Sequence, residues 1–388
     1  MKHYMTIIAV IVIALWNATS NAFWHGVAHT TGFYNFTGSN LSQWVTAVAA
    51  VNSGARNAKL LALGDSTFAG MGDLAAAPNI SYSASWPITL ASSISKGASS
   101  SFIADGNLER DISVSLPTYN PLVAFGTGWS NSANQTLGGQ LSVGATNGGI
   151  LSYAPTNSVD TFEIWYATCS GCGTATVNID GGSTLATINA NSGSTGYLKQ
   201  AVTTTAGNHT VNVVVSTNPF FIAAIVAYNV TSKQISVYNS GASGATSTNI
   251  ASAGNGFDSL NGMEAQAPDL VITEAGIIND WANAIPVATS QANLQTLITA
   301  AQLSGNIILM SPVPSNSSIV AYATQQNYVT MMKNLAYSDG IPFIDVWGLF
   351  GGTFQSSLMF NAEHPNAAGY ALIASYAKTA IANGFVSQ

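Results

Sequence analysis

Two parts of this 388-residue chain carry short apolar runs that alternate with helical patterns. In the first part, the run 59–63 stands between helical stretches at 40–52 and 86–94. The rhythm returns after about residue 232, with apolar runs at 234–238, 269–273, 306–310 and 342–345 and helical stretches at 288–303, 319–337 and 366–383. Strands that alternate with helices predict a parallel sheet with right-handed crossovers and helices on both faces. We therefore expect both parts to form one α/β domain.

The segment from about 100 to 232 has a different texture, dense in Gly, Ser, Thr and Asn. Alternating runs at 161–167, 174–179 and 210–215 are separated by turn sequences such as Asp180-Gly181. This pattern predicts a β-sandwich, jelly-roll-like, inserted between the first and second strands of the α/β domain. Two roles stay open for it: a carbohydrate-binding accessory module, or a cover for the sheet edge that shapes the active-site mouth. Trp165 and Tyr166 face opposite sides of their strand, so we expect one in the core and the other exposed.

The N-terminus has the layout of a signal peptide. Lys2 and His3 precede the apolar run 5–16, and Ser20-Asn21-Ala22 offers small residues for cleavage. The run is short for a membrane span, which needs about 20 residues. We expect a signal peptide at 1–22 and a secreted or periplasmic protein, with an uncleaved anchor as the alternative.

Composition supports export and excludes one class of partner. Charged residues make up only 6% of the chain, against roughly 25% in an ordinary soluble domain. The net charge is −7 and the nine basic residues form no cluster, so we expect no nucleic-acid partner. Cys169 and Cys172 could close a small disulfide across a turn or stay as free thiols. His25 and His29 lack a third ligand, so no metal site is expected.

Ser66 follows the first apolar run directly, in Gly64-Asp65-Ser66. Ligands of open α/β sheets bind beyond the carboxyl ends of the strands, so a serine there can meet a substrate. A serine hydroxyl is a weak nucleophile and needs a neighbouring base. Of the five histidines, only His364 lies in the α/β pattern after all its strands.

Four blocks, at 61–70, 239–246, 276–280 and 363–366, resemble in order the blocks that define the SGNH (GDSL-like) hydrolase family. The resemblance covers about 40–95 and 232–388 but not the β-rich segment. It implies a flavodoxin-like three-layer fold with Ser66 as the nucleophile and His364 as its general base, without a cofactor. It also implies an oxyanion hole formed by the N–H groups of Ser66 and Gly244 and the side-chain amide of Asn279. Gly244 matches the family pattern better than Gly241.

Two departures from the family pattern matter for the chemistry. An extra residue separates Gly276 from Asn279, so either the turn is wider or Ile277 takes the place of the glycine. Asn361 stands where the family usually has an aspartate, three residues before the histidine. An asparagine can orient the imidazole but cannot stabilise its charged form. Three interpretations stay open: a Ser-His-Asn arrangement, a Ser-His dyad oriented by another group, and a degenerate enzyme. Asp345, near the end of a predicted strand, is a less favoured substitute for the missing aspartate, and we expect it to have a structural role.

The sequence thus predicts a signal peptide (1–22), a hydrolase domain in two parts (23–99 and 233–388) and an inserted β-sandwich domain (100–232). The expected function is a secreted serine esterase that hydrolyses short acyl esters, acetyl esters on polysaccharide above all, through an acyl-enzyme. The alternatives are a lipid-type esterase or thioesterase on the same site, and a non-catalytic glycan-binding protein derived from a hydrolase.

Overall fold

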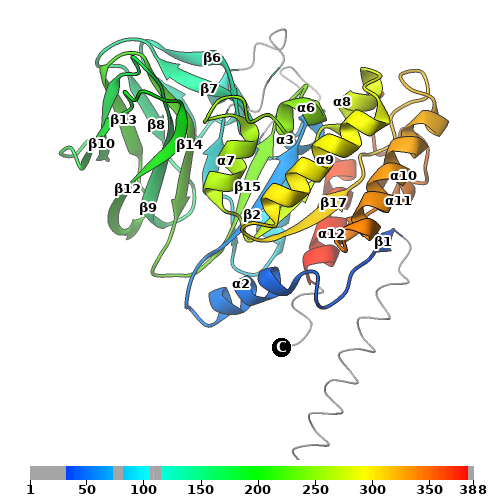
Figure 1. The fold of residues 1–388 in the computed structure, drawn as a ribbon. Coiled ribbons are helices and arrows are strands. Elements are labelled where there is room, and N and C mark those ends of the chain that lie inside the picture. The colour runs from blue at the N-terminus through cyan, green and yellow to red at the C-terminus, as the bar shows by residue number, and fades with distance from the viewer. Residues whose placement is uncertain (1–31, 73–81, 105–107, 109–114, 383–388) are drawn as a thin grey trace, which may run out of the picture.

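The computed structural model describes residues 32–72, 82–104, 108 and 115–382 (Figure 1). The signal peptide expected at 1–22, with His25 and His29, lies outside these residues.

A seven-stranded sheet forms the centre of the α/β part, in the order β1-β18-β17-β16-β2-β15-β3. Its strands are β1 (Phe33–Tyr34), β2 (Ala58–Gly64), β3 (Gly97–Ala98), β15 (Ile235–Gly241), β16 (Leu270–Thr273), β17 (Asn306–Met310) and β18 (Phe343–Ile344). Every pairing is parallel except that of the short edge strand β1 with β18. Numbered by chain order, the five central strands run 2-1-3-4-5, the flavodoxin-like order. The parallel sheet predicted from the apolar runs is confirmed.

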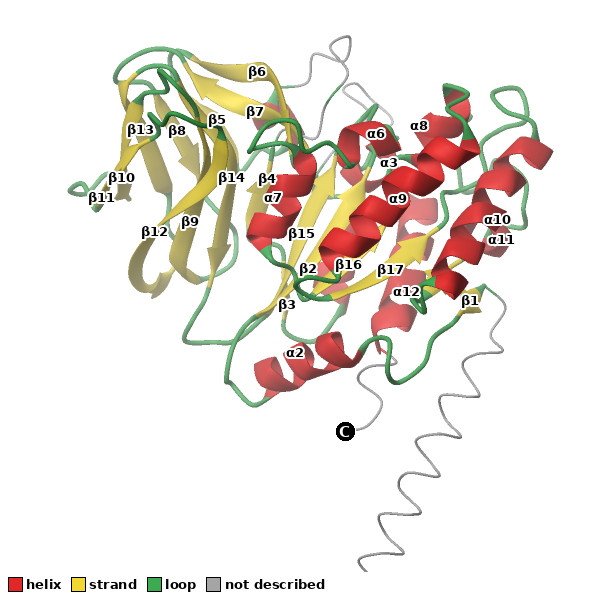
Figure 2. Cartoon of the chain, viewed as in Figure 1, coloured by secondary structure: helices red, strands yellow, loops and turns green. Residues whose placement is uncertain are grey.

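Helices cover this sheet on both faces, as its burial demands (Figure 2). One layer contains α7 (Ser259–Gln266), α9 (Val287–Ala301) and α10 (Tyr322–Ser338), which contact one another in series. On the other side α4 (Trp86–Ser93) packs against α12 (Ala367–Ala382), while α2 (Ser42–Asn52) contacts β2 and β17. No helix within the described ranges is long and apolar enough to cross a membrane.

Two antiparallel sheets lie between β3 and β15 in the sequence and beside the α/β part in space (Figure 1). The five-stranded sheet has the order β11-β10-β13-β8-β5 and the six-stranded sheet the order β12-β9-β14-β7-β6, with β4 also paired to β14. Their strands are β4 (Ser101–Ile103), β5 (Val123–Phe125), β6 (Trp129–Thr136), β7 (Gly139–Gly144), β8 (Ile150–Tyr153), β9 (Val159–Thr168), β10 (Thr174–Ile179), β11 (Ala186–Asn189), β12 (Gly196–Gly207), β13 (Val211–Thr217) and β14 (Phe220–Tyr228). The predicted runs at 161–167, 174–179 and 210–215 correspond to β9, β10 and β13.

The expectation that one of Trp165 and Tyr166 is exposed is wrong. Trp165 is 3% exposed and Tyr166 9%. Tyr166 belongs to a hydrophobic cluster that spans the two antiparallel sheets. Trp165 belongs to the cluster that also contains the core of the α/β part. The six-stranded sheet therefore buries both of its faces, because the α/β part covers the face that would otherwise meet solvent.

Cys169 and Cys172 form a disulfide. The bond closes the turn that follows β9, as one of the two sequence interpretations expected. No described cysteine is left as a free thiol.

Candidate active site

Ser66 lies where β2 ends and α3 (Ser66–Ala69) begins. Asp65 caps this short helix, because its side chain accepts the N–H of Thr67 at 2.9 Å. Gly241, at the end of the neighbouring strand β15, lets α3 approach closely: a Cβ there would stand 2.1 Å from the Ala69 nitrogen. The side chain of Ser66 is therefore held at the carboxyl edge of the parallel sheet, where the sequence predicted it.

His364 stands next to Ser66 although 298 residues separate them. Its Nε2 atom lies 2.8 Å from Ser66 Oγ, and its Nδ1 atom lies 3.0 Å from Asn361 Oδ1. The three side chains thus form a continuous Ser-His-Asn series of hydrogen bonds. A nucleophile within hydrogen-bond reach of a base that a third group orients is the arrangement that activates serine.

The amide of Asn361 can face His364 in only one way. Its Oδ1 atom also accepts the backbone N–H groups of Glu363 at 2.9 Å and His364 at 2.8 Å. Backbone N–H groups only donate, so they require the oxygen rather than the NH₂ group at this position. The imidazole must then carry its proton on Nδ1 and present a free lone pair on Nε2 to Ser66. This is the tautomer that a general base needs.

Burial lowers the pKa of His364 to about 4. A low dielectric disfavours the charged imidazolium, and the neutral Asn361 supplies no negative charge to offset this effect. His364 is accordingly neutral, and able to accept a proton, at any pH well above 4.

Gly72 brings the loop after α3 against the histidine loop. Its φ is +92°, and a Cβ there would stand 2.9 Å from Pro365 O and 3.0 Å from the Cβ of His364. Tyr370, on α12, donates its hydroxyl to Met71 O at 2.5 Å. These contacts fix the distance between the loops that carry Ser66 and His364.

Gly244 lies in the turn that follows β15. The Ala245 N–H donates to Ala242 O at 3.0 Å, and Gly244 has a φ of +77°. A four-residue turn with positive φ at its third position favours glycine there. The backbone conformation of this turn therefore favours glycine at position 244. At Gly241 the reason for glycine is different, namely the close packing of α3.

Asn279 lies in α8 (Ile277–Ala282), next to the loop of Asp65 and the Gly244 turn. Its Nδ2 atom donates to Ala245 O at 2.9 Å and to Asp65 Oδ2 at 3.2 Å. Both amide protons therefore have acceptors in the free protein. To donate to a substrate oxygen, Asn279 must give up its hydrogen bond to one of these two acceptors.

The extra residue before Asn279 lies at the start of α8. Gly276 takes the left-handed cap position of α8 with φ +75°, and Ile277 starts the helix as a buried residue. A Cβ on Gly276 would stand 2.4 Å from Ala245 O, so the glycine allows close contact with the Gly244 turn. Ile277 does not take the place of the glycine.

The remaining candidates have other roles. Asp345 caps α11 (Val346–Leu349) by accepting the Gly348 N–H at 2.8 Å. His209, between β12 and β13, pairs at 2.6 Å with Asp180, in the turn after β10. No group of three or more potential metal ligands occurs in the described part of the chain.

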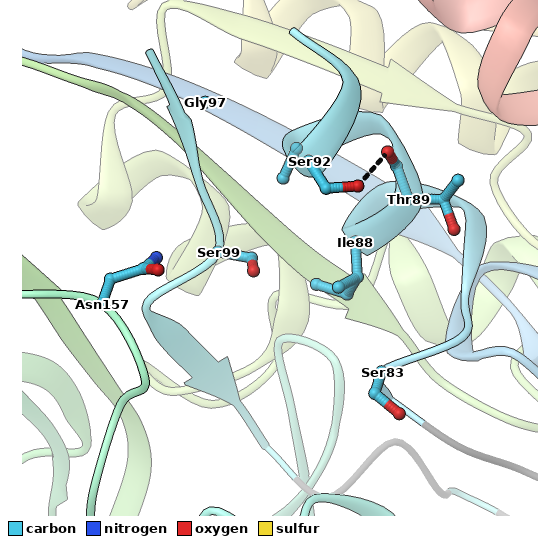
Figure 3. A pocket seen from close by; sticks show the side chains of 8 residues that line it. Ser83, Ile88, Thr89, Ser92, Gly97, Ser99 and Asn157 are labelled. Carbon is cyan, nitrogen blue, oxygen red and sulfur yellow. Dashed lines mark hydrogen bonds between the residues drawn. The ribbon is translucent and has the colours of Figure 1, made fainter. Parts of the chain in front are cut away.

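A polar hollow of about 250 Å³ lies between α4, β3 and the loop of Asn157 (Figure 3). Hydroxyl groups of Ser83, Thr89, Ser92 and Ser99 contribute to its lining. None of the predicted site residues borders it, so it is separate from the Ser66 site.

Two buried carboxyl groups behind Ser66 are absent from the sequence-based prediction. Asp65 is 0% exposed and Glu274 is 1% exposed. Each is an acidic residue placed directly at or just beyond the end of an apolar strand, at the same sheet edge as Ser66. That placement is the signal that could have identified them.

Residues 187–372 match the model of the GDSL-like lipase/acylhydrolase family. This range, just under half of the chain, is similar to that family. The matched range contains Gly244, Asn279, Asn361 and His364, whereas Ser66 precedes it. The match indicates a carboxylic-ester hydrolase. No curated protein sequence matches it.

One of two similar solved structures supports the α/β fold. A peptidoglycan O-acetylesterase structure is similar with a TM-score of 0.64 and 18% identity, covering 89% of this chain and 98% of that one. An acetylxylan esterase from Geobacillus stearothermophilus is similar at 23% identity over 38% of this chain and 73% of its own, with a TM-score of only 0.33. At 18% identity, the similarity to the peptidoglycan O-acetylesterase concerns the fold alone. The TM-score of the acetylxylan esterase is too low for any argument to rest on it.

Proposed function

We propose that this GDSL-like hydrolase is a secreted serine esterase that removes short acyl groups, acetyl above all, from carbohydrate through an acyl-enzyme on Ser66. The observation that carries the proposal is the 2.8 Å contact of Ser66 Oγ with His364 Nε2, with Asn361 on the other ring nitrogen. This contact favours a working Ser-His-Asn arrangement over the dyad and the degenerate enzyme.

The reaction follows from these positions. Ser66 Oγ attacks the ester carbonyl carbon while His364 Nε2 takes the hydroxyl proton. Negative charge then develops on the carbonyl oxygen, and the N–H groups of Ser66 and Gly244 together with the amide of Asn279 would stabilise it. When the intermediate collapses, His364 returns the proton to the departing sugar hydroxyl. Water, activated by the same histidine, then releases the carboxylic acid and restores Ser66.

Several observations support carbohydrate as the carrier of the acyl group. The structure that shares the fold over most of both chains is described as a peptidoglycan O-acetylesterase. The scarcity of charged residues and the disulfide between Cys169 and Cys172 suit an exported protein. We infer that the signal peptide at 1–22 directs the chain to the periplasm or the exterior, where acylated polysaccharide occurs.

We also propose that residues 23–99 and 233–388 form one hydrolase domain and that 100–232 is an inserted, jelly-roll-like β-sandwich. A hydrophobic cluster common to both antiparallel sheets supports this division. The insertion also borders the Gly244 turn: Asn249, on the following helix α6 (Ser247–Ile250), donates to Gln135 Oε1 at 3.2 Å. Thr136, from the same hairpin, donates to Phe257 O at 2.7 Å. These contacts favour a role in shaping the active-site mouth.

Ester hydrolysis by the purified protein tests the proposal. We expect kcat/KM to be at least about tenfold higher for p-nitrophenyl acetate than for p-nitrophenyl palmitate, and acetate to be released from O-acetylated xylan or peptidoglycan. Preference for the long acyl chain would favour the lipid-type esterase. Folded protein without turnover and without fluorophosphonate labelling of Ser66 would favour the glycan-binding alternative.

A further inference from the structure

Glu274 is the acidic residue that follows β16 directly, and its side chain is 1% exposed. Its carboxyl group accepts three backbone N–H groups. Oε1 accepts those of Asp65 at 2.9 Å and Gly276 at 2.9 Å, and Oε2 accepts that of Ile277 at 2.8 Å. One of these donors belongs to the loop of Ser66, and the other two belong to the turn that begins the helix of Asn279.

The backbone is shaped around this carboxyl group. Gly64 has no side chain where a Cβ would stand 2.4 Å from the ring of Phe68 and 2.8 Å from Glu274 Oε1. Ala275 and Gly276 both have positive φ values, +58° and +75°, and an alanine in this conformation is strained. The strained turn aims the N–H groups of Gly276 and Ile277 at the carboxyl group, so three separate backbone features accommodate one side chain.

We propose that Glu274, as a carboxylate, is a positioning residue that holds the loop of Ser66 and the turn of Asn279 in catalytic register. This inference rests on the proposed function for its kinetic consequence. An ionised carboxylate only accepts hydrogen bonds and suits three donors, whereas a carboxylic acid would have to place its own proton among them. These three hydrogen bonds of the Glu274 carboxyl group go to backbone N–H groups on either side of the site rather than to the side chains of Ser66 or Asn279.

We call the three backbone hydrogen bonds to the Glu274 carboxylate the Glu274 clasp. The neighbouring charges make this clasp sensitive to pH. Burial raises the pKa of Glu274 to about 7, and burial also raises the pKa of Asp65, with a further rise from the adjacent Glu274. Two further acidic groups act on this pair: Asp280 of α8 raises the pKa of Glu274, and Glu363 of the histidine loop raises that of Asp65. Proton uptake by Glu274 as the pH falls through about 7 would weaken the clasp.

Glu274→Gln tests the proposal, with Glu264→Gln as the matched control. Glu264 lies exposed on α7 and contributes no part of the site. In Glu274→Gln the new NH₂ group faces at least one N–H donor, so we expect kcat to fall about 10- to 100-fold, the size expected for a small misplacement of reacting groups. KM should change less than about twofold, and a step in log kcat near pH 7 should disappear. The control should keep wild-type kcat and the step.

Amide hydrogen exchange provides a reading that does not depend on turnover. Protection of the Asp65, Gly276 or Ile277 N–H groups should fall in Glu274→Gln and remain in the control. Unchanged kcat, or unchanged protection, in the folded variant would overturn the proposal. If Glu274→Gln does not fold, Glu274→Asp gives the same readings, because its carboxylate stays charged but is one methylene shorter. Wild-type protein without turnover or Ser66 labelling would contradict the proposed function instead, and hydrogen exchange would still decide whether the clasp exists.

Discussion

Asn361 Oδ1 lies 3.0 Å from His364 Nδ1 and accepts the backbone N–H of the same histidine at 2.8 Å. One oxygen therefore fixes both the loop and the ring of the general base. The amide reproduces the orienting role that an aspartate has in the usual serine triad, but it leaves the imidazolium without a counter-charge.

Asn361→Asp separates orientation from charge. The carboxylate can accept the same three N–H groups, and its negative charge should raise the pKa of His364 from about 4 toward the ordinary value of about 6.5. We expect kcat to be preserved or raised. Asn361→Leu removes the acceptor and should lower kcat by about 10²-fold or more, since the wrong tautomer then competes. Steady-state kinetics on p-nitrophenyl acetate measure both, and indifference to both changes would leave a Ser-His dyad.

The pH profile of kcat/KM should extend unusually far toward acid. His364 acts as a base only when neutral, and burial lowers its pKa to about 4. As the pH falls, we expect a partial decrease near 7 from protonation of Glu274, and complete loss only below about 4. Complete loss near pH 6.5 would mean that His364 has an ordinary pKa. Initial rates from pH 3.5 to 9 with a soluble acetyl ester distinguish the two profiles.

Gly72→Ala should displace His364 without altering any group that takes part in the reaction. The new Cβ would stand 3.0 Å from the His364 Cβ, and we expect kcat to fall about 10- to 100-fold. Gly54→Ala is a matched control, because Gly54 also has a positive φ, +77°, but meets nothing within 4 Å. In both variants an alanine adopts a strained left-handed conformation, so we expect a lower Tm in both. Only Gly72→Ala should have a lower kcat. Equal kcat values in the two variants would contradict this role of Gly72.

Asn279→Ala tests the third oxyanion donor. Loss of one such donor typically lowers kcat about 10²- to 10³-fold, and we expect this result although both amide protons have acceptors in the free protein. Asn327→Ala, at an exposed position of α10, is the control. A decrease of less than about fivefold would show that Asn279 keeps Asp65 and Ala245 as its partners and that the N–H groups of Ser66 and Gly244 act alone.

The sequence predicted the parallel sheet well, because strands buried on both faces are short apolar runs that turn residues separate. It did not predict α7, whose sequence contains Asn261 and Gly262, or α8, which is only six residues long. Ser66, His364 and Asn361 were predicted as neighbours from a family resemblance. The orientation of Asn361 could not be predicted, since it depends on two backbone N–H groups of a folded loop. The burial of both Trp165 and Tyr166 was missed for a similar reason: it depends on how two parts of the chain pack together.

Covalent labelling of Ser66 is the most direct test of the central claim. The purified protein is treated with a fluorophosphonate, and the adduct is located by intact mass and peptide mapping. We predict one adduct per chain on Ser66, absent in Ser66→Ala and formed at least about 10²-fold more slowly in His364→Ala. Folded wild-type protein that takes up no label, or takes it up at another residue, would contradict the assignment of Ser66 as the nucleophile.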